Sequence, residues 1–547
     1  MKKFSLRFSA AIFAFVVLSL SVFAQSRTET FAITKAQIVT VSGPNISRGT
    51  VVIRDGLIEA VGENAKVPAD AQVIDGTGLT IYPGFFDALT SLGIPPPTPP
   101  RPPGQGQAAA QNQPTSNSNY PDGLRPEEIA ASQLKAGEAQ FETQRNTGIT
   151  TVLTVGREGI FNGQSVLINL AGDSVSAMII KSPVAEHITF TTIRTGAYPT
   201  SLLGTFSALR QMFLDAQRLQ ELKKKYDKNP SGMKRPADDK SLEALIPILN
   251  REMPIVMNAN TEREIIRALD LAREFNLKAI IAGGQEAWKV AIRLKTQDVH
   301  VLLSLDFPKR TTATSAEAAP ESLELLRLRA ETPKNAARLA QAGVKFAFQS
   351  GTMKSINDFL VNANESVKNG LDKNAAIRAM TLSSAEIFGV ENRLGSVEKG
   401  KIANLLVVRG DVLAKDKTLT HVFVDGKLFE QKEKPKTLPT ATTQPAAVAT
   451  VGGNYTITIE IPGQPLSGTL SLIQEGAILS GTLQTQLGTS PIKDGKVTAE
   501  GFDFASTVEF GGTTFDIIVK GAVAGNQISG TITSPQGAIP FSGTKTP

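Results

Sequence analysis

The chain has 547 residues, which is too long for one domain and predicts roughly two to four. It has no cysteine, which excludes disulfides, thiolate metal sites and cysteine nucleophiles, and its three histidines leave few ligands for zinc. The formal net charge is +6, and removal of a cleavable leader that contains Lys2, Lys3 and Arg7 leaves +3 on the mature chain. With so small a charge, nucleic acid is not expected as a partner.

Residues 1–24 have the pattern of a secretory signal peptide. Three basic residues precede an apolar run at 10–22, and Val22, Phe23 and Ala24 place small residues at the cleavage positions. The apolar run is short, and no later stretch is apolar enough to span a bilayer. We therefore expect a secreted or periplasmic protein with no membrane span after signal cleavage.

Antiparallel strands are predicted at 31–61, where apolar and polar residues alternate around turns at 42–45 and 55–56. Residues 394–427 carry a similar pattern, with an Asp425-Gly426 hairpin turn. The two distant segments are expected to share one β structure.

Between these segments, short apolar strands alternate with amphipathic helices, a pattern typical of a parallel α/β barrel. The predicted strands are 84–88, 150–155, 166–170, 177–181, 255–259, 279–282, 301–305 and 346–350. The predicted helices are 201–226, 262–275, 285–294, 320–342 and 373–388. The third and fourth strands are too close for a crossover helix, so a hairpin is expected at that point.

Two low-complexity segments interrupt the pattern. Residues 95–120 are rich in proline, then in Gly, Gln, Ala, Asn and Ser, and are expected to be a disordered loop or a proline-rich docking site. Residues 431–452 are predicted to be a linker. The sequence after 453 is rich in β-branched residues and repeats Ser-Gly-Thr at 467, 480, 529 and 542, which predicts hairpins of a β-barrel or sandwich.

The stretch VIDGTGLTIYPGFFDALTSLG at 73–93 resembles the segment that opens the barrel of the amidohydrolase superfamily. GKIANLLVV, with Asn404 in the usual acidic place, and the segment beginning PIVMNANTEREIIRALDLAREF are similar to its secreted, imidazolonepropionase-like subfamily. The resemblance implies an α/β fold with a TIM-like (β/α)8 barrel at 81–393. It also implies a composite β-sandwich made from 25–80 and 394–430, in addition to the all-β domain at 453–547.

The resemblance also identifies five positions where relatives carry metal ligands or the catalytic aspartate. Relatives hold zinc or another divalent metal with residues of the first, fifth and sixth strands, and an aspartate of the eighth strand takes a proton from the bound water. Here these positions are Leu89, Ser91, Asn258, Gly283 and Gly351. None offers good metal-binding chemistry, so we predict no metal and a barrel that has lost its site. Packing or surface roles are expected for His187, His300 and His421, and Lys181 without partner ligands is a weak candidate for a metal-bridging lysine.

Three functions stay open at this point. In the first, the protein is non-catalytic, binding a small amide molecule through Asn258, Asn260, Gln285 and Ser350, or partnering an active amidohydrolase paralogue; ordinary capping of strand ends explains these residues equally well. In the second, it hydrolyses C–N bonds other than peptide bonds through an atypical site, with Asp87 and Asp306 as weak acid–base candidates. In the third, it is a scaffold that acts through the C-terminal β domain.

Overall fold

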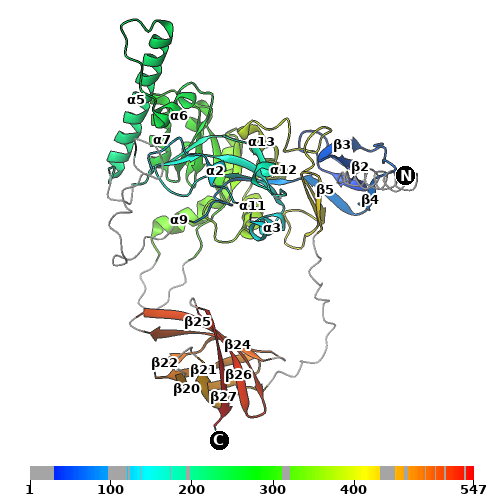
Figure 1. Ribbon diagram of the computed structural model, residues 1–547. Coiled ribbons are helices and arrows are strands. Elements are labelled where there is room, and N and C mark those ends of the chain that lie inside the picture. Colours follow the sequence, from blue (N-terminus) through cyan, green and yellow to red (C-terminus); the bar gives the residue numbers. More distant parts are fainter. Residues whose placement is uncertain are drawn as a thin grey trace, which may run out of the picture. The chain divides into compact units, whose positions relative to one another are not determined.

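The chain divides into two compact units, Met1–Glu433 and Lys434–Pro547, which are described separately below (Figure 1). The computed structural model describes residues 30–96, 120, 123–135, 137–172, 174–192, 198–310, 321–430, 450–460, 466–486, 488–498, 501–510, 513–534 and 537–546. The predicted signal peptide and most of the predicted loop at 95–120 and linker at 431–452 lie outside these residues.

An eight-stranded sheet joins the start of the first unit to its end. Its strands are β1 (Phe31–Ile38), β2 (Ile46–Arg54), β3 (Leu57–Gly62), β4 (Gln72–Asp75), β5 (Leu79–Pro83), β16 (Leu405–Arg409), β17 (Thr418–Val424) and β18 (Lys427–Glu430). The link is the antiparallel pair β5–β16. Phe31, Ile81, Leu405 and Phe423 share one buried cluster, so segments more than 300 residues apart are held by a common core.

The side chain of Asn404 links this sheet by hydrogen bonds to the strands that contain Thr151 and Asn169. Its Nδ2 donates to Thr151 Oγ1 (3.0 Å) and Asn169 Oδ1 (2.9 Å), and its Oδ1 accepts from Asp425 N (2.8 Å). Asn169 Nδ2 in turn donates to Asp425 Oδ1 at 2.6 Å. A neutral amide can donate and accept at once, which an ionised aspartate at this position cannot do.

Two further sheets form the centre of the unit. One runs β10-β9-β7-β6 and the other β15-β14-β13-β12-β11-β8. Their strands are β6 (Phe85–Thr90), β7 (Ile149–Thr154), β8 (Phe161–Gln164), β9 (Val166–Asn169), β10 (Ile179–Lys181), β11 (Glu186–Thr189), β12 (Ile255–Ala259), β13 (Ala279–Gly283), β14 (His300–Ser304) and β15 (Phe346–Gln349). β6–β7 and β11 through β15 pair in parallel, whereas β8 and β9 run antiparallel to their neighbours. We call β6, β7, β8/β9 and β11–β15 the central strands.

The two central sheets meet at both ends. β8 and β9 are consecutive halves of one segment but belong to different sheets. At the other end, Gly351 N, just beyond β15, donates to Leu89 O of β6 at 3.1 Å. Side chains from successive central strands, including Phe86, Leu153, Val256 and Leu302, then pack into one buried cluster.

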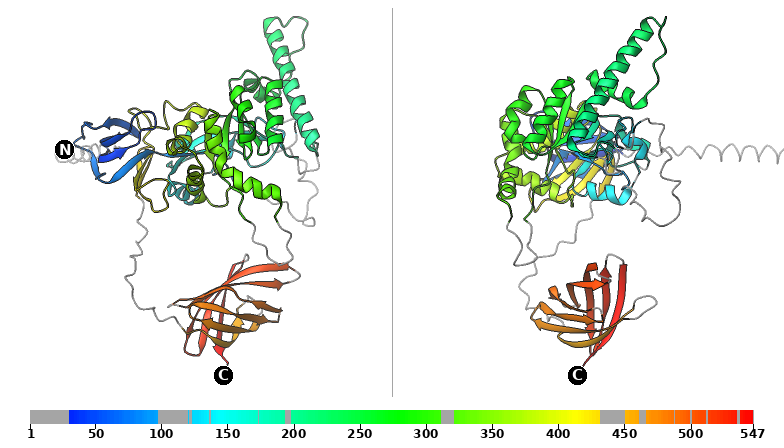
Figure 2. Two further views of the ribbon diagram at one scale, coloured as in Figure 1. Left: turned by 180° about the vertical axis from the view of Figure 1, so that it is seen from behind. Right: turned by 90° about the vertical axis from the view of Figure 1, so that its left-hand side faces the viewer.

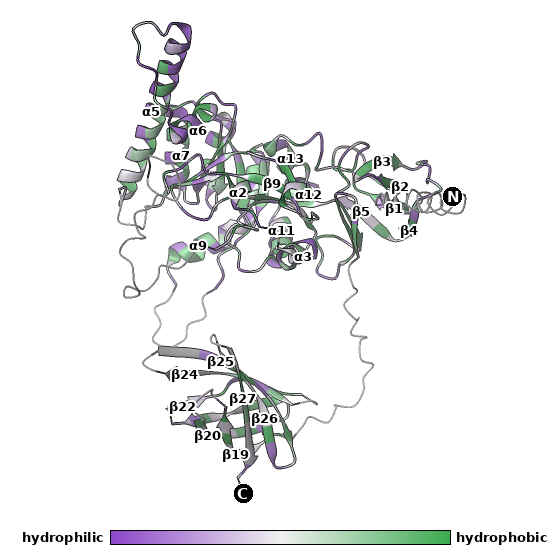
Figure 3. Ribbon diagram, in the orientation of Figure 1, coloured by the Kyte–Doolittle hydropathy of each residue, from purple (hydrophilic) through white to green (hydrophobic). Residues whose placement is uncertain are grey.

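Helices cover the central strands. They are α2 (Ala130–Gln133), α3 (Glu138–Arg145), α4 (Val175–Met178), α5 (Leu202–Lys228), α6 (Lys240–Leu249), α7 (Glu262–Glu274), η1 (Ala287–Val290), α8 (Ala291–Thr296), α9 (Leu323–Glu331), η2 (Thr332–Lys334), α10 (Asn335–Gln341), α11 (Asp358–Lys368), α12 (Lys373–Ala379) and α13 (Leu382–Phe388). Ser201 caps α5, and Thr261 with Glu264 forms a capping box on α7. The far part of α5 projects from the unit and is mostly hydrophilic (Figures 2 and 3). No helix in the described ranges is long and apolar enough to cross a membrane.

The mixed α/β fold is as predicted, with local corrections. The helix predicted at 373–388 is two helices, α12 and α13, separated at Met380 and Thr381. The strand predicted at 177–181 is only the three-residue β10, an edge strand that pairs antiparallel with β9 and so forms the expected hairpin. The strand beside β12 is instead β11, which the prediction missed because it is only four residues long. The helix predicted at 320–342 breaks into α9, η2 and α10 at Pro333, which lacks an N–H group and disfavours a helical residue before it.

The C-terminal unit is a β-barrel of nine strands, in agreement with the predicted all-β domain. They are β19 (Gly453–Ile459), β20 (Leu466–Glu475), β21 (Ile478–Thr485), β22 (Gly488–Pro491), β23 (Lys493–Val497), β24 (Phe502–Phe510), β25 (Thr513–Ala524), β26 (Gln527–Ser534) and β27 (Gly537–Lys545). The sheet order runs from β20 around to β21, and β20 also pairs with β21, which closes the ring.

The repeated Ser-Gly-Thr triplets lie on two hairpins, β20–β21 and β26–β27. A Cβ added at Gly481 would lie 1.9 Å from Ser471 O, and one at Gly530 would lie 2.1 Å from Lys520 O. Only glycine allows neighbouring strands to approach this closely, so the repeat has a steric cause in the curved barrel wall.

Candidate functional site

The polar residues singled out in the sequence lie where parallel central strands end. Asn258 is near the end of β12, Gly283 is the last residue of β13, Asp306 follows β14 and Gly351 follows β15. Parallel strands bring their carboxyl ends to one edge, so these residues share the carboxyl edge of the central sheets. We call this region the carboxyl edge.

Gly283 lies beneath two carboxamide groups. Its backbone is left-handed (φ +88°), and a Cβ built on it would lie 2.3 Å from Asn260 Oδ1 and 3.2 Å from Asn258 Oδ1. Asn258 is exposed, whereas Asn260 is half-buried. The volume that a side chain at 283 would need is therefore taken by the Asn260 amide, and the two amide oxygens converge above Gly283.

Gly351 repeats this arrangement at the end of β15. Its backbone is also left-handed (φ +50°), and a Cβ there would lie 2.4 Å from Gln349 Oε1. Gln349 is buried, its Nε2 donates to Leu302 O at 3.4 Å, and its Oε1 has no hydrogen-bond partner among the described residues. The place of a side chain at 351 is thus filled by a second carboxamide.

Asp306 and Gln285 connect the loops after β14 and β13. Gln285 Nε2 donates weakly to Asp306 O at 3.5 Å, and Asp306 Oδ2 accepts from Thr352 Oγ1 at 2.9 Å. Both residues are half-buried, so the Asp306 carboxylate is tied to the loop after β15 rather than buried in a low-dielectric pocket.

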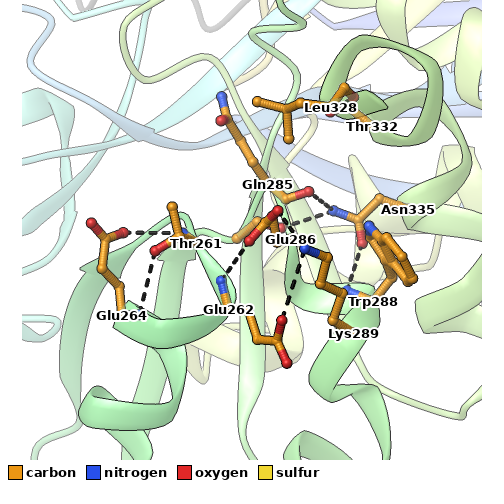
Figure 4. Close-up of polar contacts among 11 residues, drawn as sticks. Thr261, Glu262, Glu264, Gln285, Glu286, Trp288, Lys289, Leu328, Thr332 and Asn335 are labelled. Atoms are coloured by element: carbon orange, nitrogen blue, oxygen red, sulfur yellow. Dashed lines mark hydrogen bonds and ion pairs between the residues drawn. The ribbon is translucent and has the colours of Figure 1, made fainter. Parts of the chain in front are cut away.

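A polar network that the sequence prediction missed holds the loop after β13 (Figure 4). Glu286 accepts from Glu262 N (2.8 Å) and Lys289 Nζ (2.6 Å), and Asn335 Nδ2 donates to Gly284 O (2.8 Å) and Gln285 O (3.0 Å). The Gln285 side chain extends away from this network. The network holds the backbone of Gly284 and Gln285 in place, while the side-chain amide of Gln285 points away from the network.

Asp87 is fully buried and joins β6 to β15. Its carboxylate accepts from Ser350 N at 2.8 Å, from Ser350 Oγ, and from Leu89 N at 3.4 Å. Burial raises the pKa of Asp87 from 3.8 to about 6, against the opposing effect of these hydrogen bonds. The structure therefore brings Asp87 together with Ser350, and both side chains are engaged in that contact.

Leu89 lies near the end of β6, and Ser91 is the first residue after this strand. Leu89 is half-buried and packs against the cluster formed by the central strands. Ser91 is half-buried, and its carbonyl accepts from Arg157 Nη2 at 3.2 Å and from Ile94 N at 3.1 Å. Leu89 offers no donor atom for a metal, and Ser91 offers only a hydroxyl.

The histidines and Lys181 lie apart from the carboxyl edge or inside the core. His187 on β11 is buried, which lowers its pKa to about 3. His300 is the first residue of β14, His421 lies in β17, and Lys181 Nζ donates to Phe388 O at 2.7 Å. Within the described ranges, no group of three or more His, Asp or Glu residues is placed to hold a metal ion.

Comparison with known proteins finds similarity to one family over part of the chain and to solved structures over most of it. A model of the amidohydrolase family matches residues 253–429. The structure is similar to that of an amidohydrolase from Thermotoga maritima MSB8, with a TM-score of 0.60 and 25% identity over 73% of this chain and 100% of that one. A putative prolidase from Bifidobacterium longum aligns with a TM-score of 0.42 and 18% identity over 74% of this chain and 95% of that one. No curated protein matches the sequence.

The filled space at Gly283 predicts a stability difference between two left-handed glycines. Gly343 (φ +70°) has no neighbour closer than 3.5 Å to an added Cβ, so Gly343→Ala is expected to cost only the backbone strain of about 1 kcal/mol. Gly283→Ala should cost about 1–2 kcal/mol more, because the methyl group meets the Asn260 amide. Adding Asn260→Ala to Gly283→Ala should recover that difference in urea unfolding, and equal costs for the two glycines would contradict the steric account.

The Asp87 contact predicts a pH-dependent difference between the native protein and Asp87→Asn. Because the pKa of Asp87 is raised in the folded state, its contribution to stability is fully present below pH 3.8 and is lost as pH rises through about 6. Asn keeps an acceptor for Ser350 N but does not ionise, so its free energy of unfolding should improve relative to the native protein by on the order of 2–3 kcal/mol between pH 4 and 7. Urea unfolding at both pH values tests this, and a difference that does not change with pH would refute it.

Proposed function

We propose that this chain, which belongs to the amidohydrolase superfamily, binds a small amide-bearing molecule at the carboxyl edge and does not hydrolyse it by metal-dependent chemistry. One observation carries the proposal. Positions 283 and 351 are left-handed glycines in this chain, and the volume that a side chain would need there is filled by the carboxamide of Asn260 or Gln349. Secretion through residues 1–24 is part of the proposal.

The proposal includes a TIM-like (β/α)8 barrel built from the two central sheets. The parallel order β11–β15, the shared β8/β9 segment and the contact of Gly351 with Leu89 support a closed barrel with a reversed third strand. The eight-stranded sheet, in which β5 pairs with β16, supports the composite β-sandwich. In such a barrel the carboxyl edge is the mouth where ligands bind.

The residues present do not fit zinc. Zinc takes imidazole nitrogen, thiolate or carboxylate ligands, whereas the five family positions offer an alkyl chain, a hydroxyl, an amide and two glycines. At both glycines, the space in which a ligand side chain would stand is taken by Asn260 or Gln349. No step of the proposed function is therefore routed through a metal.

Carboxamides suit recognition of an amide. Each offers an oxygen that accepts and a nitrogen that donates, so it can pair with both the N–H and the C=O of a ligand amide. Asn258 is exposed and its oxygen lies near that of Asn260, while Gln285 reaches the same edge from the next loop. Ser350 was predicted as a fourth pocket residue. It is buried against Asp87, so in this proposal it links β15 to β6 and does not contact the ligand.

The alternative of a metal-free hydrolase has less support. Asp87 has a raised pKa suited to a general base, but it is fully buried and accepts hydrogen bonds from Ser350 and Leu89. Asp306 is half-buried, and its carboxylate already accepts a hydrogen bond from Thr352 Oγ1 at 2.9 Å. An active paralogue as partner and a scaffold role for the C-terminal barrel are secondary proposals that no described contact favours.

Binding without turnover is the expected result of a ligand screen. The mature protein is titrated by calorimetry with N-acyl amino acids, dipeptides and cyclic amides, and each mixture is then assayed for released amine. We expect saturable binding of at least one class with no product, and weakening by about tenfold in Asn258→Ala from loss of a hydrogen bond to the ligand amide. Asn374→Ala, exposed on α12, is the control. Turnover that a chelator abolishes would overturn the metal-free proposal, and turnover that persists with a chelator would favour the metal-free hydrolase instead. An unchanged affinity in Asn258→Ala would overturn the assigned site.

A further inference from the structure

A cleft lies at the end of the central strands opposite the carboxyl edge. Its volume is about 370 Å³, within the range of small-molecule sites. Its wall includes residues that directly precede central strands: Pro254 comes before β12 and Lys278 before β13. The cleft therefore opens at the amino-terminal ends of the strands, away from Asn258 and Gly283.

Two lysines from different elements face this cleft. Lys181 belongs to β10, and Lys278 lies in the turn between α7 and β13. Lys181 Nζ donates one hydrogen bond, to Phe388 O at 2.7 Å, which leaves two ammonium hydrogens. Neither lysine forms an ion pair with a carboxylate in the part of the chain that the structure describes.

The two ammonium groups act on each other. Desolvation lowers the pKa of Lys181 and the positive charge of Lys278 lowers it further, while the negative charge of Glu391 opposes both effects. An anion placed between them would relieve this repulsion and compensate the desolvation.

The carboxylates at the cleft do not do this. Glu386 is engaged by Lys345, with Oε2 at 2.8 Å from Nζ, and by Arg378. Glu252 is exposed at the cleft and accepts from Asn250 Nδ2 at 3.1 Å. Glu386 is thus paired with other cations and Glu252 with a neutral amide, so neither occupies the Lys181 or Lys278 ammonium group in the described residues.

The rest of the wall is largely apolar. It includes Pro183, Val184, Met253, Pro254 and Phe388, contributed by three separate segments. An apolar wall beside paired cations fits a molecule with an anionic head and a short hydrocarbon body.

We propose that this cleft is a binding site for a small organic anion, whose carboxylate or phosphate group lies between Lys181 and Lys278 and whose apolar part packs on the proline-rich wall. The site is separate from the carboxyl edge and does not depend on whether the protein is an enzyme. It is a place where a carboxylated or phosphorylated small molecule would bind to the face of the barrel opposite the mouth.

Calorimetric titration of the full mature protein with three six-carbon probes tests the chemistry. Hexanoate and hexyl phosphate carry the two candidate head groups, and hexanamide is a neutral match for hexanoate. We expect one or both anions to bind at least about tenfold more tightly than hexanamide, because a charge-assisted hydrogen bond is worth more than a neutral one. Equal affinity of the anions and hexanamide, or no binding of either anion, would overturn the proposal.

Variants locate the site. Lys278 is exposed, so Lys278→Gln should fold normally and weaken anion binding by about tenfold, and Lys181→Arg should retain most of the affinity because it keeps the charge. Lys224→Gln, exposed on α5, is the matched control and should bind as the native protein does. If Lys278→Gln binds the anion with native affinity, or if Asn258→Ala weakens binding instead, the anion is not held in this cleft and the assignment fails.

Discussion

A buried carboxylate holds the first and last central strands together. Asp87 on β6 accepts hydrogen bonds from the backbone and hydroxyl of Ser350, at the end of β15, and the next residue, Gly351, donates to Leu89. Removing a carboxylate from water is costly, and the three donors around Asp87 offset only part of that cost, as its raised pKa indicates. The same contact sets Leu89 beside Gly351, so the geometry of the carboxyl edge depends on it.

At the carboxyl edge, carboxamide side chains lie over two left-handed glycines. Under the proposed function, these amides stand where relatives would place metal ligands. The exchange is sterically consistent, because Asn260 and Gln349 fill the volumes that side chains at 283 and 351 would need. Restoring a ligand at either glycine would therefore require a neighbouring amide to move as well. This steric occupation at both glycines is what the proposed amide-binding role rests on.

The sequence predicted the elements with strong local signals. The strand predicted at 84–88 corresponds to β6, the helix predicted at 262–275 corresponds to α7, and the Ser-Gly-Thr repeats marked the hairpins of the C-terminal barrel. It failed where a strand was very short, as in β11, and where a single Pro333 divided a helix with otherwise regular periodicity. Asn258, Asn260 and Gln285 were singled out by residue type and position at strand ends, and their ligand-binding role is a proposal. The amides of Asn260 and Gln349 over the two glycines could not be predicted, because the contacts depend on side-chain placement in three dimensions. The pairing of Lys181 with Lys278 depends on segments about 100 residues apart, and no local pattern indicates it.

The metal content of the mature protein tests the central claim most directly. Protein purified without chelators is incubated with excess zinc, desalted and analysed by inductively coupled plasma mass spectrometry, alongside Asn258→Ala to identify zinc bound at the carboxyl edge. The account predicts far less than one zinc ion per chain and no difference between the two proteins. One zinc ion per chain in the native protein that is lost in Asn258→Ala would contradict it.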